Sequence, residues 1–206
     1  MSENETGFPQ LIVERKTGGE KFYHGGSPLD LTLLAFWQWS ASDLVSNATR
    51  GILAEYIVAN ALGLAGGVRG EWDAFDLLTK NGVKIEVKSA AYLQSWYHKK
   101  LSAITFGIRP TRLWNASTNE LAAELKRQAD IYVFCVLNHK EKDSLDPLNL
   151  DQWEFYILRA SVLNEKFMTQ KTIRLASLLK LNPHIAKYEG IARYIEKLSD
   201  EIKRAS

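Results

Sequence analysis

The chain has 206 residues, of which 46% are hydrophobic and 24% charged, proportions that are ordinary for a soluble globular protein. This length suits one domain with a substantial core, so we expect a single domain over residues 1–206. The formal net charge of +2 excludes no class of partner. The lone cysteine, Cys135, excludes an intrachain disulfide and a cysteine-based zinc site.

The amino-terminal part predicts a cytoplasmic protein that begins with a flexible arm. Its first six residues are polar and acidic and lack the basic and apolar regions of a signal peptide. The longest apolar stretch, around Leu31 to Trp39, is too short to span a bilayer, so no membrane contact is expected. Residues 1–26 have little periodicity and contain two glycine pairs, which favours an irregular arm.

A first helix is expected to begin near Ser27 and Pro28, because serine caps helices and proline is tolerated at the first helical position. Aromatic residues in an apolar helix are usually packing residues, although two tryptophans here could also stack on bases. The apolar residues at helical spacing are Leu29, Leu33, Phe36 and Trp37.

A second helix is expected from Asn47 or Thr49 to Leu62, where a glycine follows as a stop signal. Glu55 shares a stripe with Ile52 and therefore interrupts an apolar helix face. A buried carboxylate is costly unless it is paired or bound to a cation. Glu55 is accordingly either a functional acid or a residue at the edge of the stripe.

Residues 72–88 predict a β-hairpin, in which two runs of β-forming residues flank a Lys-Asn-Gly turn. A two-residue turn would place Leu77 opposite Glu86 and mix apolar with charged side chains. A three-residue loop would place Leu77 opposite Ile85 and give one coherent apolar face. We favour the second register, because a buried face pins the register of a strand.

The favoured register also places Phe75 opposite Val87 and Asp76 opposite Glu86. Two facing carboxylates repel each other, so a cation between them is expected. Mg²⁺ prefers oxygen ligands and is commonly held by one or two carboxylates. Lys88 projects to the same face as Glu86 because strands have a period of two. The simpler alternative is a solvated strand face on which Glu86 and its neighbouring lysines neutralise one another.

An acid that opens a strand, followed by a turn and then Glu-x-Lys, resembles the PD-(D/E)XK nuclease superfamily. Asp76 matches the first acid of this motif, and Glu86 and Lys88 match its (D/E)-x-K. The sequence departs from the motif at Phe75, which stands in the place of the proline. Asp73 competes for the role of first acid, but the register favours Asp76.

The resemblance covers roughly Arg50 to Trp96 and implies an α/β fold with a restriction-endonuclease-like α/β/α core. Such a core has a mixed central sheet flanked by helices, and this chain would add N- and C-terminal helices. The resemblance also implies hydrolysis of DNA phosphodiester bonds with Mg²⁺, for which Mn²⁺ can substitute. Asp76, Glu86 and the Val87 carbonyl would then hold the cation.

The family resemblance suggests roles for three further side chains. Lys88 would orient the attacking water or balance negative charge on the phosphate. Glu55 would bind a second metal ion or a water molecule bound to the first metal ion, since the first core helix of the family commonly carries such a glutamate. Gln94 resembles a glutamine that contacts water or phosphate in several branches of the family, and it could equally be a plain surface residue.

The segment from Tyr97 to Trp114 contains basic residues and no acidic residue, the most uneven charge distribution in the chain. Interleaved with aromatic residues and close in sequence to the hairpin, it could bind the phosphates of DNA, or it could be a solvated face. Its basic residues are His98, Lys99, Lys100, Arg109 and Arg112.

The remaining elements continue the α/β alternation. The last helix, over residues 182–204, has an apolar face that suits docking on the body or on a partner. We expect strands at Ser102–Ile108, Ile131–Leu137 and Trp153–Leu158, and helices at Thr118–Ala129, Ala160–Phe167 and from Asn182 onward, with Thr172–Leu181 open to either structure.

Taken together, these patterns predict a metal-dependent deoxyribonuclease, in which cleavage of both strands would favour a homodimer. Two alternatives stay open. The chain could be a nucleic-acid-binding module of the same fold with weak or lost catalysis, or a structural protein whose hairpin charges are merely solvated.

Overall fold

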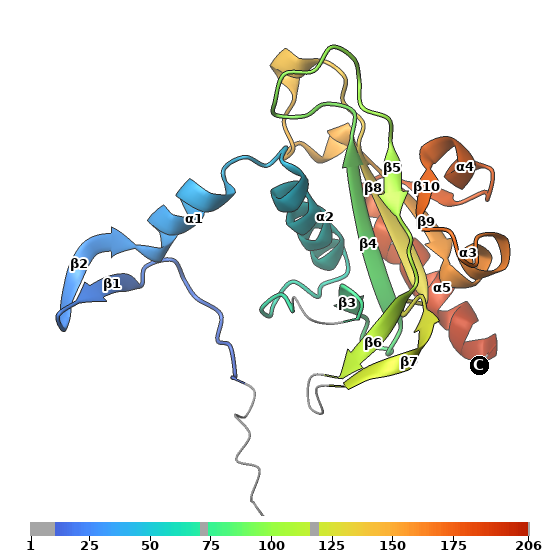
Figure 1. The fold of residues 1–206 in the computed structure, drawn as a ribbon, viewed down its shortest axis with the longest axis horizontal. Coiled ribbons are helices and arrows are strands. Elements are labelled where there is room, and N and C mark those ends of the chain that lie inside the picture. The colour runs from blue at the N-terminus through green and yellow to red at the C-terminus, as the bar shows by residue number, and fades with distance from the viewer. Residues whose placement is uncertain (1–10, 71–73, 116–119, 206) are drawn as a thin grey trace, which may run out of the picture.

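The computed structural model describes residues 11–70, 74–115 and 120–205. Its centre is a five-stranded mixed sheet with the strand order β11-β9-β8-β4-β3 (Figure 1). Strands β4 and β8 are parallel, and the other neighbours are antiparallel. The strands are β3 (Leu77–Leu78), β4 (Lys84–Ala91), β8 (Ile131–Leu137), β9 (Trp153–Arg159) and β11 (His184–Ala186).

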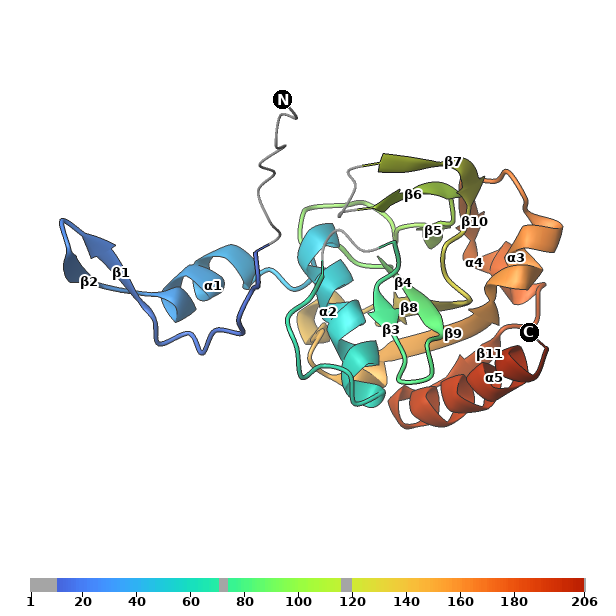
Figure 2. The ribbon, with the colours of Figure 1, turned by 90° about the horizontal axis from the view of Figure 1, so that it is seen from below.

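Helices and small strands cover the two faces of this sheet, so the fold-class prediction of a mixed α/β sheet flanked by helices is confirmed (Figure 2). Helices α2 (Asn47–Ala61) and α5 (Ile191–Ala205) pack in one hydrophobic cluster. The other cluster contains helices α3 (Ala160–Lys166) and α4 (Leu175–Leu179) and the paired strands β5 (Thr105–Gly107) and β10 (Thr172–Arg174). Three short 3₁₀ turns lie at Lys142–Ser144, Leu150–Gln152 and Tyr188–Gly190.

The prediction of a buried central strand is confirmed at β8, where all seven residues are buried. A strand whose residues are apolar on both faces requires cover on both faces, and the two clusters provide it. Cys135 lies in this strand, where burial raises the pKa of its thiol well above the ordinary value. The thiol is therefore an unreactive core group.

Helix α2 begins and ends close to where the sequence predicts. The Ser46 side chain caps its start by accepting a hydrogen bond from the Thr49 amide. After Leu62, the chain turns at Gly63, whose φ of +66° is favourable for glycine. Within the described residues, no helix is both long and apolar enough to cross a membrane.

The predicted register of the hairpin is confirmed. Leu77 pairs with Ile85, and the Thr79 amide donates to the Val83 carbonyl at 3.0 Å. The turn contains three residues and ends at Gly82, whose φ is +80°. The three-residue loop therefore sets the register that places Asp76 next to the part of β4 that carries Glu86 and Lys88.

The helix expected over Thr118–Ala129 is wrong in the structure. Strand β7 (Glu120–Lys126) runs there instead and pairs with β6 (Thr111–Asn115) as a hairpin. Leu121 and Leu125 suggested a helix because they are four residues apart, but this spacing also puts both on one face of a strand. The hydrogen-bonded pairing with β6 makes this segment a strand and not a helix.

The amino-terminal expectations also need correction. Strands β1 (Lys21–His24) and β2 (Ser27–Thr32) form a hairpin, so the expected helix start at Ser27 and Pro28 lies in a strand. Gly25 and Gly26 have φ values of +57° and +78°, the backbone that a tight hairpin turn requires. Helix α1 (Leu33–Ala41) begins later, where Thr32 caps it through the Ala35 amide.

The last helix starts nine residues later than predicted. Asn182, with φ of +52°, redirects the chain, and His184–Ala186 then adds strand β11 to the edge of β9. Helix α5 begins only at Ile191. It packs on the core through its apolar face, which contains Ile191, Ile195 and Leu198.

Candidate active site

The candidate site lies where the ladder between β3 and β4 stops. Asp76, just before β3, donates its amide to the Ile85 carbonyl at 3.0 Å. At the next ladder position, the Val87 amide donates to Asp76 Oδ2 at 2.6 Å. The Asp76 side chain thus accepts the hydrogen bond that a backbone carbonyl of β3 would otherwise accept. The Asp76 carboxylate is thereby fixed against the strand that carries the Glu-x-Lys sequence.

Glu86 and Lys88 project together from one face of β4, as the period of a strand requires. Their ladder neighbours are Tyr132 and Phe134, which belong to the cluster opposite α2. The Lys88 ammonium forms an ion pair with the Glu86 carboxylate, and the two side chains are 32% and 19% exposed. The expected juxtaposition of this acid and this amine is present, and both retain access to solvent.

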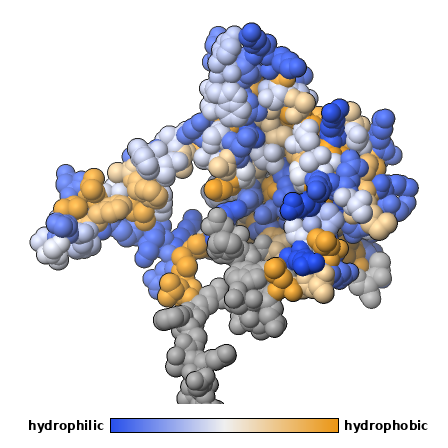
Figure 3. All heavy atoms as spheres, in the orientation of Figure 1, coloured by the Kyte–Doolittle hydropathy of each residue, from blue (hydrophilic) through white to orange (hydrophobic). Residues whose placement is uncertain are grey.

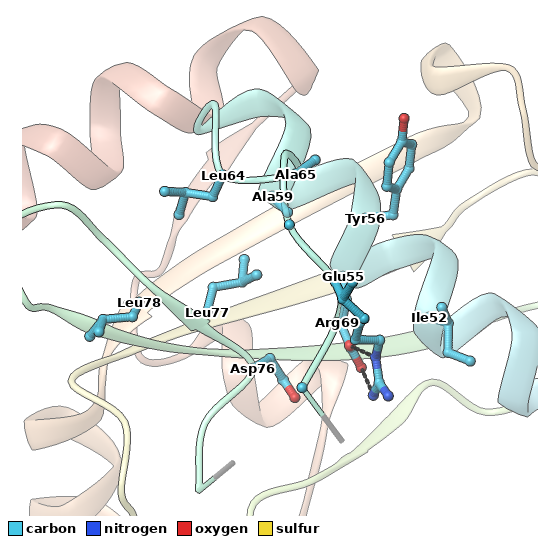
Figure 4. Close-up of a pocket in the computed structure, with 13 residues that line it drawn as sticks. Ile52, Glu55, Tyr56, Ala59, Leu64, Ala65, Arg69, Asp76, Leu77 and Leu78 are labelled. Atoms are coloured by element: carbon cyan, nitrogen blue, oxygen red, sulfur yellow. Dashed lines mark hydrogen bonds and ion pairs between the residues drawn. The ribbon is translucent and has the colours of Figure 1, made fainter. Parts of the chain in front are cut away.

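Glu55 reaches the site from helix α2, on the other face of the sheet. Its side chain is 14% exposed. The carboxylate accepts hydrogen bonds from both Nε and Nη2 of Arg69, the bond from Nη2 at 3.0 Å. Glu55, Arg69 and Asp76 line one pocket of about 320 Å³ between α2 and β3 (Figure 4). The partly buried Glu55 carboxylate is therefore paired, and it lies beside the hairpin acid.

Negative charge is concentrated around Asp76. Burial, the largest cause, and the charge of Glu86 raise the pKa of this carboxyl from 3.8 to about 7, the net result of all its neighbours. The hydrogen bond from Val87 and the charge of Lys88 oppose this rise, whereas the charge of Glu55 adds to it. A group with these neighbours is stabilised in its ionised form by any added positive charge.

The Val87 carbonyl also belongs to this edge of β4. Within a strand, the N–H and C=O of one residue point to the same side, and the Val87 amide points to Asp76. The candidate oxygen donors are thus the carboxylates of Asp76 and Glu86 and this carbonyl. Among the described residues, no group of three or more His, Cys, Asp or Glu side chains is arranged to hold a metal ion.

Gln94 lies apart from these acids, in a network of its own. It is 7% exposed, and its amide nitrogen donates to the Ala91 carbonyl and to Ser102 Oγ, both at 3.2 Å. Its amide oxygen accepts from Arg50 at 3.5 Å. In this structure the side chain is bonded within the protein, and a contact with water or phosphate stays a prediction.

The predicted basic surface is divided between two ends of the molecule (Figure 1). Lys99 and Lys100 are exposed in the loop that follows β4. Arg109 and Arg112 are exposed at the other end of β5, where hairpin β6–β7 begins and where β3 also lies. The arginines are therefore on the side of Asp76, and the lysines are at the far end of β4.

The predicted pairing of Phe75 with Val87 is not formed. Phe75 does not extend the ladder opposite Val87, since the chain turns away at Asp76. Instead, Phe75 packs in the cluster on the other face, with the Lys84 ammonium 5.5 Å from its ring centre. Asp73, the competing first acid, lies outside the described residues.

Two arginines near the site were not found from the sequence. Arg69 follows Gly66 and Gly67 in a loop, and nothing local marks it as the partner of Glu55. Arg50 is 3% exposed and ties α2 to β4 by donating to Ser89 Oγ at 3.0 Å. It lies five residues before Glu55 on helix α2, which is not the three- or four-residue interval that places two side chains on one helix face, so no periodicity marks Arg50 either.

Comparison with known proteins places the chain in a family. Residues 33–177 match the family model described as bacteriophage T4 endonuclease IV, a range that contains Glu55, Asp76, Glu86 and Lys88. No curated protein and no solved structure matches the chain. Because the matched range covers well over half of its length, the chain belongs to the bacteriophage T4 endonuclease IV family.

Proposed function

We propose that this chain is a Mg²⁺-dependent DNA endonuclease whose active site is built from Asp76, Glu86 and Lys88, with Glu55 beside them. Family membership makes it an endonuclease. The observation that carries the site assignment is the attachment of the Asp76 carboxylate to β4, directly beside Glu86 and Lys88. This arrangement supports the PD-(D/E)XK resemblance of the hairpin.

The donor set suits Mg²⁺. Asp76, Glu86 and the Val87 carbonyl supply oxygen atoms only, the ligand type that this ion prefers. Burial and the charges of Glu86 and Glu55 raise the pKa of Asp76, so a cation here would relieve repulsion. Mg²⁺ commonly keeps several waters and uses one or two carboxylates plus substrate phosphates, so a third carboxylate is not required.

Each side chain then has a distinct task. When bound, the metal would polarise the scissile phosphate and lower the pKa of a bound water. Lys88 Nζ, now held by the Glu86 carboxylate, would donate to the phosphate oxygens and stabilise the negative charge that develops on them. Asp76 is held by the Val87 amide, so its carboxylate needs little reorganisation on binding.

The DNA backbone would pass along the end of the molecule that carries Asp76. Arg109 and Arg112 are exposed on this side, and guanidinium groups bind phosphates through two hydrogen bonds. Lys99 and Lys100, at the other end of β4, would contact more distant phosphates.

Metal titration tests the site. Wild type should bind Mg²⁺ in calorimetry, and the double variant Asp76→Asn, Glu86→Gln should lose this binding. Asp130→Asn is the matched control, because Asp130 also accepts an amide of β4, that of Lys84, at 2.9 Å. Equal heats from wild type and the double variant would remove the metal from the hairpin.

Cleavage tests the role of the lysine. Lys88→Ala should abolish nicking of plasmid DNA in Mg²⁺ or Mn²⁺ while changing the free energy of unfolding by about 1 kcal/mol or less, since the side chain lies outside the core. Lys84→Ala is the matched control on the same strand and the same face, and it should retain activity. Full nicking by Lys88→Ala would exclude Lys88 from the chemistry.

A second candidate is a DNA-binding module with weak catalysis. The observation that favours it is the internal neutralisation of Glu86 by Lys88 and of Glu55 by Arg69. This reading predicts that wild type binds DNA equally with and without Mg²⁺ and does not nick it. Nicking that requires metal and Lys88 would exclude it.

A further inference from the structure

An N-terminal arm, residues 17–41, stands away from the rest of the molecule in Figures 1 and 2. It contains β1, β2 and α1. Helix α1 is rich in leucine and aromatic residues, and yet it buries none of its residues. Figure 3 shows apolar side chains gathered on the surface of the arm. Its most exposed large apolar residues are Tyr23 at 69%, Leu31 at 52%, Leu34 at 51% and Trp39 at 84%.

The arm has a definite internal structure. The Leu34 amide donates to the Gly18 carbonyl at 2.9 Å, which attaches the start of α1 to the segment before β1. Gly18, with φ of +92°, approaches Trp37 so closely that a Cβ there would lie 3.1 Å from its ring. Just before the arm, Arg15 donates to the Gly66 carbonyl at 3.1 Å, which attaches the chain there to the loop after α2.

This structure is too small to be stable without further burial. An isolated two-stranded hairpin is marginal in water, and a helix of nine residues is shorter than isolated helices that persist. A helix that is apolar on all sides is normally a buried helix. The arm therefore requires a covering surface that its own chain does not supply in this conformation.

The charge of the arm argues against nucleic acid as that partner. Among residues 17–41 the charged side chains are Glu20, Lys21 and Asp30, two acids and one base, so the formal charge is −1. Lys21 is already paired with Asp30 at 3.0 Å. Because binding to DNA depends on basic groups that neutralise phosphates, this surface suits an apolar protein partner.

The body carries an apolar groove between helix α2 and the segments at residues 147–150 and 188, here called the α2 groove. No charged residue lines it. Leu148 is 65% exposed at its rim, and Tyr56 is 55% exposed on α2. The groove is lined by Leu53, Tyr56, Ile57, Asn60, Pro147, Leu148, Leu150 and Tyr188.

We propose that the N-terminal arm packs into the α2 groove of a second copy of this chain, and that the second copy returns the same contact. Both uncovered apolar surfaces belong to one chain, and a two-fold exchange covers two arms and two grooves at once. Helix α1 is about 14 Å long, and the α2 residues that line the groove, Leu53 to Asn60, extend over about 11 Å, so the groove can take most of the length of the helix. The inference is independent of the metal site.

Sedimentation of the full chain tests the exchange. Wild type should be a dimer, and Trp39→Glu in the arm or Leu148→Glu in the groove should raise the dimer dissociation constant at least about tenfold, because each places a charge in an apolar contact. Leu121→Glu is the matched control: Leu121 is 64% exposed, as Leu148 is 65%, but it lies on β7. This variant should remain a dimer.

Mixing the two variants separates exchange from other modes of association. A heterodimer of Trp39→Glu with Leu148→Glu keeps one intact contact, an unaltered arm in an unaltered groove. The mixture should therefore dimerise more tightly than either variant alone, with circular dichroism unchanged in all samples. A monomeric wild type, or a dimer that neither substitution weakens, would overturn the proposal. Loss of DNA binding by Trp39→Glu in a monomeric protein would assign the arm to nucleic acid instead.

Discussion

Replacement of Asp76 by asparagine should stabilise the metal-free protein at neutral pH. Asparagine has nearly the same shape, and its amide oxygen can still accept the Val87 amide, a bond of 2.6 Å in the wild type. What it removes is a negative charge in a half-buried position beside Glu86 and Glu55. The acid that we propose as a metal ligand is thus also a source of instability in the absence of a cation.

The sign and size follow from the pKa of this carboxyl, which is about 7 in the folded protein instead of 3.8. Below about pH 4 the group is protonated in both folded and unfolded chains, so the raised pKa then contributes its full stabilisation. As pH rises toward 7, the unfolded chain loses the proton more readily, and this stabilisation is lost. At about 1.4 kcal/mol per pH unit the full effect approaches about 4 kcal/mol. Screening by water at a partly exposed group reduces it to about 2–4 kcal/mol.

Urea unfolding in EDTA at a series of pH values measures this difference. The wild type should lose about 2–4 kcal/mol relative to Asp76→Asn between pH 4 and pH 8. Asp130→Asn serves as the control, because it removes another carboxylate that is bonded to an amide of β4. Glu86→Gln removes a charge that raises the pKa of Asp76, so in this variant the loss of stability caused by Asp76 should be complete at a lower pH. If the free energies of unfolding of wild type and Asp76→Asn differ by the same amount at every pH in this range, the raised pKa of Asp76 is refuted.

Two further predictions concern arginine and lysine residues. Replacing Lys99 and Lys100 by alanine should flatten the salt dependence of DNA binding by about one unit of slope per lost phosphate contact, as measured by fluorescence anisotropy. The matched pair Arg109→Ala, Arg112→Ala should do the same and also reduce cleavage; an unchanged slope in either pair assigns it to plain surface. Arg127→Met should lower the free energy of unfolding by about 3 kcal/mol in urea titration, because it removes the donor from the buried carbonyl of Ile108 and the part-buried carbonyl of Phe167, now bonded at 2.8 and 2.7 Å. Arg159→Met, which breaks an exposed pair with Glu201, should cost under about 1 kcal/mol, and an equal loss in both would contradict this assignment.

The centre of the fold could be predicted because its local and long-range signals agree. An uninterrupted apolar run gives β8, and apolar residues at helical spacing followed by a terminal glycine give α2. The errors lie where one pattern fits two structures. Leucines four residues apart at positions 121 and 125 suit a helix and a strand equally, and only the partner strand β6 decides.

The geometry of the candidate site was predictable where it is local in sequence. Hairpin register alone brings Asp76 to β4, and alternation alone pairs Glu86 with Lys88. The Glu55–Arg69 pair joins a helix to a loop, and no periodicity encodes such a contact. The separation of Lys99 from Arg109 likewise depends on which way the chain runs through β5, which charge counting along the sequence does not reveal.

The early end of strand β3 explains both the position of Asp76 in the candidate site and the cost in stability of placing an acid there. Had the ladder continued, the Val87 amide would have bonded to a backbone carbonyl, and Asp76 would have faced outward as an ordinary strand residue. Because the ladder stops at Leu77, the Val87 amide bonds to the Asp76 carboxylate instead, which fixes this acid near Glu86. The same geometry removes the carboxylate from water and raises its pKa. An acid in that position gains most from a bound cation, so the stability lost in the metal-free protein is the counterpart of the affinity for metal that we propose.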